Sequence, residues 1–136
     1  SWVGAWANLG AGTVNSNLLN TYGDVAMRLS PDGPRLRSGR QFLGCVIGDH
    51  AKTAIGTRIM TGTSIGTGAM IATSTPPAAT VPAFTWATDA GTRSYRFDKF
   101  LDVARTVMAR REIVLEEAAE ARLRELHPEA GRGVGS

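Results

Sequence analysis

Cysteine is almost absent from this sequence of 136 residues, and so are long apolar runs. The single Cys45 has no partner for a disulfide within the chain, and a lone thiol is typical of a reducing compartment. No apolar stretch approaches the ~20 residues that a membrane-spanning helix needs, and no signal-peptide core is evident. We therefore expect a cytoplasmic protein with no membrane partner.

Histidine is equally scarce, and basic residues exceed acidic ones only slightly. Two histidines, His50 and His127, are too few for a zinc site built on three, so we predict no metal site. The net charge of +3 comes entirely from residues 1–76, which contain six basic and three acidic residues. Residues 77–136 contain nine basic and nine acidic residues and are therefore neutral overall. This small excess disfavours nucleic acid, which needs a broad basic face, and suits a small phosphorylated ligand.

A six-residue repeat is the main pattern that is present. Aliphatic or β-branched residues recur at every sixth position, and a small residue follows four positions later: Ile47, Thr53, Ile59, Ile65 and Ile71, with Ala51, Thr57, Thr63 and Ala69. This period fits neither an α-helix nor an ordinary strand, and it is typical of a hexapeptide parallel β-helix. We predict an all-β solenoid with an inserted loop and a C-terminal α-helix.

Breaks in the repeat divide the chain. The expected parts are a β-helix over 1–75 with a loop insertion at 15–40, an extended connector over 76–93, a helix over 94–127 and a flexible tail over 128–136. Turn residues around Ser30-Pro31-Asp32-Gly33 predict a short hairpin in the loop. Because the repeat is already running at Val3 without a cap, we expect the chain to be the C-terminal piece of a longer protein.

Several short strings are specific. They are Asn8-Leu9-Gly10-Ala11-Gly12-Thr13, followed by Asn17, Asn20, Tyr22 and Gly23, then Gly48-Asp49-His50-Ala51-Lys52-Thr53 and Val81-Pro82-Ala83-Phe84-Thr85-Trp86. Together they resemble the C-terminal domain of the bifunctional N-acetylglucosamine-1-phosphate uridylyltransferase / glucosamine-1-phosphate acetyltransferase family. The later strings are more similar still to a bacterial branch of sugar nucleotidyltransferase-like proteins with a hexapeptide tail.

This resemblance implies a left-handed β-helix, a homotrimer, and acetyl-CoA bound between adjacent prisms. It assigns Asn8, Asn17 and Tyr22 to the substrate, and Ala11, Ala54 and Thr73 to the acetyl-CoA site. In that family the catalytic histidine lies on a coil that has no counterpart in this sequence. The nucleotidyltransferase domain, which would hold any Mg²⁺, also has no counterpart here. We therefore expect this fragment to be catalytically incomplete.

The remaining chemistry-bearing residues have two interpretations each. His50 is the candidate general base, or alternatively a surface or trimer-contact histidine. Lys52 and Arg40 could grip the phosphates of the sugar and of acetyl-CoA, or they lie on a solvated face. Asp49 is expected to satisfy turn amides, and His127 is expected to be solvated.

Two functions follow. The first is an acetyltransferase-type domain of a sugar-1-phosphate nucleotidyltransferase-like enzyme, which moves an acetyl group from acetyl-CoA to an amino-sugar phosphate. The alternative is a trimerisation or regulatory module of a nucleotidyltransferase, without transfer activity of its own.

Overall fold

The computed structural model describes residues 1–129, and most of its regular structure is short parallel strands. One sheet has the order β1 (Trp2–Val3), β6 (Val46–Ile47), β9 (Ser64–Ile65) and β11 (Thr80–Val81). A second has the order β13 (Gly91–Ser94), β12 (Thr85–Thr88), β10 (Met70–Ala72), β7 (Lys52–Thr53) and β2 (Asn8–Leu9). A third pairs β3 (Val14–Asn15) with β8 (Arg58–Ile59).

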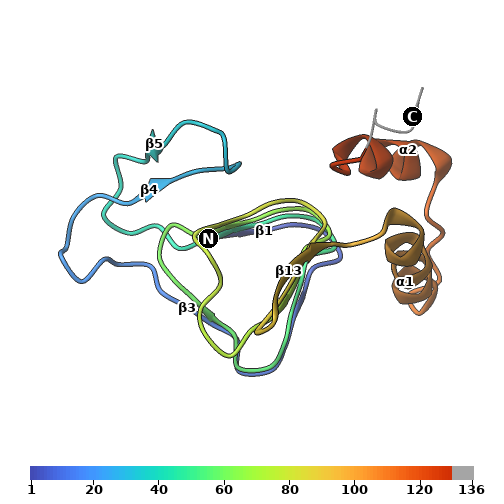
Figure 1. Cartoon of the computed structure of the whole chain (residues 1–136), viewed down its shortest axis with the longest axis horizontal. Helices are drawn as coiled ribbons and strands as arrows, with labels where there is room; N and C mark the ends of the chain where they lie inside the picture. Colours follow the sequence, from blue (N-terminus) through green and yellow to red (C-terminus); the bar gives the residue numbers. More distant parts are fainter. Residues whose placement is uncertain (130–136) are drawn as a thin grey trace.

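The register of these pairs reflects the sixfold repeat. Val46 pairs in parallel with Ser64, and Lys52 with Met70, so corresponding strands lie 18 residues apart, which is three hexads. Figure 1 shows the chain passing along three sides of a triangular outline, with strands stacked along each side. This parallel arrangement is compatible with the predicted β-helix.

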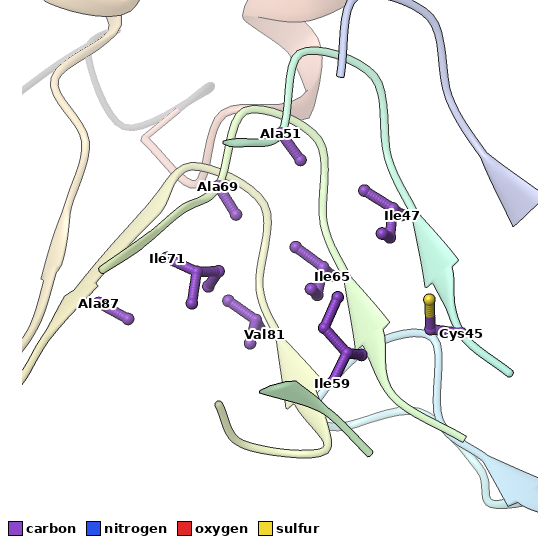
Figure 2. Packing of buried hydrophobic residues seen from close by; sticks show 9 residues of the cluster. All are labelled: Cys45, Ile47, Ala51, Ile59, Ile65, Ala69, Ile71, Val81 and Ala87. Atoms are coloured by element: carbon purple, nitrogen blue, oxygen red, sulfur yellow. The ribbon is translucent and has the colours of Figure 1, made fainter. Parts of the chain in front are cut away.

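The interior of this outline holds the residues that the repeat singles out. Figure 2 shows them pointing toward one another from the three sides: Cys45, Ile47, Ala51, Ile59, Ile65, Ala69, Ile71, Val81 and Ala87. Threonines share the interior: Thr57 Oγ1 donates to the carbonyl oxygen of Ala54 at 2.8 Å, whereas the buried Thr63 hydroxyl has no hydrogen-bond partner among the described residues. Burying an isoleucine contributes roughly 1.5–3 kcal/mol, so the repeated positions supply much of the stability.

The inserted loop leaves one corner of the triangle and contains the predicted hairpin. Strands β4 (Ala26–Met27) and β5 (Leu36–Arg37) pair in antiparallel fashion. The turn between them is closed by the Gly33 amide, which donates to the carbonyl oxygen of Ser30 at 3.0 Å. The hairpin prediction is therefore confirmed.

The chain after residue 75 differs from expectation. The connector over 76–93 is not simply extended, because β11 and β12 pair in parallel with β9 and β10 and continue the stack. The pattern was missed because Ser64 pairs with Thr80, a spacing of 16 residues rather than 18, which breaks the hexad count.

The helix expected over 94–127 is divided in two, at the place near Arg111–Glu116 where the sequence leaves a break open. The structure has α1 (Phe97–Ala109) and α2 (Glu117–Leu126), separated by a turn in which Glu112 has φ of 58°. A left-handed backbone at this residue cannot continue an α-helix. Of the expected tail over 128–136, residues 130–136 lie outside the described residues.

Helix α1 covers the outer face of the second sheet. Phe100, Leu101 and Ala104 are buried in one cluster with Phe84 and Tyr95, and outward-facing residues of the sheet pack against this cluster. Within residues 1–129, no helix combines the length and the apolar character that crossing a membrane requires.

Candidate functional site

One row of side chains crosses the outer face of the second sheet. The strand registers align Asn8, Lys52, Met70, Trp86 and Arg93 in this order. Met70 and Trp86 pack against the cluster under α1. The Asn8 end of the row borders an open hollow.

This hollow, which we call the cationic hollow, has a volume of about 450 Å³. The sheet side contributes Trp6, Ala7, Asn8 and Lys52, and the end of α1 contributes Val107, Arg110 and Arg111. Three of these seven residues are cationic and none is acidic. Within residues 1–129, no carboxylate lies within ion-pair distance of the three cations.

Lys52 is the most enclosed of the three cations. Its side chain is half-buried, and burial lowers the pKa of its ammonium group below the usual range. The Nζ atom donates to the carbonyl oxygen of His50 at 3.3 Å. A partly desolvated cation interacts more strongly with an anion than a fully hydrated one does, because the local dielectric constant is lower.

A column of residues at one corner of the triangle holds α1 beside this hollow. Trp6, His50, Gly68 and Phe84 each lie two residues before an aligned strand residue, and their φ angles are 60°, 58°, 70° and 54°. We call this set the corner column. A left-handed conformation costs a non-glycine residue roughly 1–2 kcal/mol, so this corner is strained where other corners use glycine. The strain places large rings on the outside of the corner, where α1 docks.

His50 lies within the corner column rather than in the hollow. Its ring stacks on Trp6 with centroids 6.4 Å apart, and it meets the Phe100 ring of α1 nearly at right angles with centroids 5.5 Å apart. The residue is buried, and its Nδ1 atom has no hydrogen-bond partner. Burial, with a smaller effect of the Lys52 charge, lowers the pKa of the imidazole below its usual value. The enclosed environment therefore favours the neutral form of the ring.

The hollow brings together only two of the predicted site residues, Asn8 and Lys52. Asn17 and Tyr22 are exposed in the loop, where their carbonyl oxygens accept from Leu43 and Gln41. Arg40 is also exposed there, and its carbonyl oxygen accepts from the Val25 amide at 2.8 Å.

The residues expected at the acetyl-CoA site do not line the cationic hollow. Ala11 and Ala54 are exposed at or near the turns that follow β2 and β7. Thr73 follows β10, and its hydroxyl donates to the carbonyl oxygen of Thr75 at 2.7 Å. It lines a separate hollow of about 420 Å³ together with Pro76 and Pro77.

Sequence reasoning did not find the arginines of the hollow. Arg110 and Arg111 follow the last turn of α1. They lie near Lys52 only because α1 packs on the outer face of the second sheet. Trp6 forms one wall of the hollow. The pair of adjacent arginines next to the helix break was the available signal.

The expectation for His127 is wrong. It is buried, its Nε2 atom lies 2.8 Å from the carbonyl oxygen of Tyr95, and its Nδ1 accepts from the Glu129 amide at 3.2 Å. Its ring packs beside Phe84 and Phe97. The end of α2 folds back onto the aromatic cluster, and no local sequence pattern predicts such a long-range contact.

The hollow is thus a polar, positively charged recess with one aromatic wall and one amide. It is suited to bind an anion that carries hydroxyl or amide groups. Among the described residues, no three His, Cys, Asp or Glu side chains gather as a metal site. No protein-family model and no curated protein matches this sequence.

Proposed function

We propose that this chain is the acetyltransferase-type domain of a sugar-1-phosphate nucleotidyltransferase-like enzyme, built as a left-handed parallel β-helix that works as a homotrimer. The cationic hollow binds the amino-sugar phosphate. The observation that carries this proposal is the convergence of Lys52, Arg110 and Arg111 on one recess whose lining contains no acidic residue.

Each wall of the hollow suits one part of such a ligand. Arginine guanidinium groups bind phosphate oxygens in pairs, and Lys52 adds a point charge. The Asn8 amide can donate to and accept from sugar hydroxyls. The indole of Trp6 offers a flat apolar surface for the C–H face of a sugar ring.

The donor, acetyl-CoA, is proposed to approach the corner of the triangle that joins the second and third sheets, where Ala11 and Ala54 lie. Ala11 and Ala54 are exposed and small, which leaves room for a thin pantetheine chain, and the Arg40 side chain is exposed for its phosphates. We assign no proton transfer to His50, because Trp6 and Phe100 enclose its ring. The fragment then binds its ligands without a complete set of groups for transfer.

A second candidate function is assembly alone, as a trimerisation or regulatory module. Large apolar side chains away from α1 are exposed, with Val14 at 57%, Ile55 at 79% and Met60 at 54%. Apolar surface of this kind favours contact with another protein surface.

Thermal unfolding separates the two functions. Glucosamine 1-phosphate at millimolar concentration should raise the Tm of the wild-type chain, because a ligand that binds only the folded state stabilises it. Acetyl-CoA should do the same, and release of free thiol measures any transfer.

A matched pair of variants locates the site. Lys52→Met should abolish the shift caused by the sugar phosphate, while Lys99→Met, at the exposed start of α1, should retain it. The absence of a shift with either ligand would favour the assembly role.

A further inference from the structure

The inserted hairpin carries unpaired positive charge beside apolar side chains. Residues 24–40 contain four arginines, Arg28, Arg35, Arg37 and Arg40, against two aspartates. Within residues 1–129, none of these arginines lies within ion-pair distance of a carboxylate. Leu29 and Leu36 are 58% and 45% exposed on the same hairpin. We call this surface the arginine hairpin.

The segment that contains α2 has the opposite character. Residues 112–129 contain six glutamates and only two arginines. Arg105 and Arg124 already engage Glu120, whereas Glu116 and Glu117 are exposed and form no ion pair among the described residues. Ile113 and Val114 are 47% and 81% exposed just before α2. We call this surface the acidic arm.

These two surfaces cannot meet within one copy of the chain. Figure 1 shows β4 and β5 on one flank of the triangular stack and α1 and α2 on the opposite flank, with the strands between them. A contact between the arginine hairpin and the acidic arm therefore requires two molecules.

We propose that the arginine hairpin of one copy docks on the acidic arm of a second copy. Arg35 and Arg37 face Glu116 and Glu117, while the exposed leucines of the hairpin cover Ile113 and Val114. Because the two patches differ, the contact is heterologous, and repeating it produces a ring if the rotation closes or a filament if it does not. This inference rests on the proposed self-association and is independent of what the cationic hollow binds.

A second copy fits better than an unrelated acidic partner, because one chain supplies both halves of the complementary pair. Exposed ion pairs are individually weak, so several pairs and an apolar centre are needed together. The contact should also weaken as the salt concentration rises. Dissolved ions screen the attraction between exposed charges, over a length of about 8 Å at physiological ionic strength.

Charge reversal tests this contact by sedimentation velocity over a range of chain concentrations. The wild-type chain should self-associate, and the double variants Arg35→Glu/Arg37→Glu and Glu116→Arg/Glu117→Arg should each weaken association at least tenfold. The quadruple variant that combines both pairs should recover it, because every contact is restored with reversed sign. Arg96→Glu/Lys99→Glu, an equal charge change at the start of α1, is the control and should associate as the wild type does.

Three outcomes would overturn the proposal: a wild-type chain that is monomeric at every concentration, double variants that associate normally, or a quadruple variant that stays dissociated. A trimer insensitive to all these changes would overturn only this pairing and leave the proposed function standing.

Cross-linking at a concentration where the chains associate gives a second measurement, which identifies the contacting residues directly. In the Arg37→Lys variant, carbodiimide should join the new amine to Glu116 or Glu117 of another chain. Mixing isotopically light and heavy chains identifies the link as intermolecular by mass spectrometry. Links found only within one chain would contradict the proposal.

Discussion

The space that Gly68 leaves open in the corner column is filled by the Phe84 ring and, slightly farther away, by the Phe100 ring of α1. A Cβ atom built on Gly68 would lie 3.3 Å from the Phe100 ring and 2.7 Å from the Phe84 ring. The two rings meet edge to face with centroids 4.9 Å apart. The one glycine of the column therefore creates the socket through which α1 docks, and α1 in turn carries Arg110 and Arg111 to the cationic hollow.

Replacing Gly68 should close this socket. Gly68→Ala should lower the free energy of unfolding by about 2–4 kcal/mol, because overpacking adds to the cost of a left-handed alanine. Gly56→Ala is the matched control, since Gly56 has the same φ of 70° and nothing within 4 Å of the new Cβ. Gly56→Ala should lower the free energy of unfolding, measured by urea denaturation, by only about 1 kcal/mol. Equal losses would show that backbone strain alone is measured.

Removing the ring from the other side should loosen α1. Phe100→Ala should cost roughly 3–5 kcal/mol, as expected for a fully buried phenylalanine. Val103→Ala, on the exposed side of the same helix, should change stability by less than about 0.5 kcal/mol. Hydrogen exchange should show faster opening of α1 in the first variant. Unchanged protection of α1 would argue against the socket as its anchor.

His50 should make the protein less stable in mild acid. Its pKa in the folded state is lowered by burial and by Lys52, so the unfolded chain binds the proton more readily. The stabilising contribution is complete above the ordinary histidine pKa of about 6.5 and is lost as the pH falls through the folded value.

Urea denaturation of the wild type and of His50→Asn at several pH values between 5 and 8 measures this effect. Asparagine tolerates the left-handed backbone and does not titrate. The wild type should lose stability below pH 6.5 with a slope of at most about 1.4 kcal/mol per pH unit relative to the variant. Parallel profiles would refute the role of His50, since His127 is present in both proteins.

Lys52 should react as an amine at a lower pH than an ordinary lysine. Burial lowers its pKa from the ordinary value of 10.5, so its reactive neutral form is populated earlier as the pH rises. The chain has only one other lysine, Lys99, which serves as an internal reference for mass spectrometry after amine labelling. Inorganic phosphate should slow labelling of Lys52 and leave Lys99 unchanged. Equal slowing of both would indicate a salt effect rather than a site.

Local patterns predicted the parts of this chain that repeat. Ile47, Ile59, Ile65 and Ile71 all lie in the interior as the hexad spacing indicates. The hairpin at Ser30 to Gly33 was predictable because its turn chemistry is local. The later strands were not, because their pairing follows a spacing of 16 residues.

The candidate site was only half predictable. Asn8 and Lys52 occur in strings specific enough to be singled out, and the strand register places them side by side. Arg110 and Arg111 carry no such pattern, and His127 was expected in solvent because a residue beside a proline near the chain end is usually exposed. Their positions depend on how two helices settle on an aromatic cluster.

By itself, the sequence determined that the repeated hexad positions from Ile47 to Ile71 are interior, since each hexad turns its first residue to the inside of one side of the triangle. Only the tertiary structure decided where the positive charge is concentrated. Lys52 and Arg110 share a recess because Phe100 of α1 packs next to Gly68. The contact between Phe100 and Gly68 joins residues far apart in the chain, so it depends on shape and burial rather than on any local repeat.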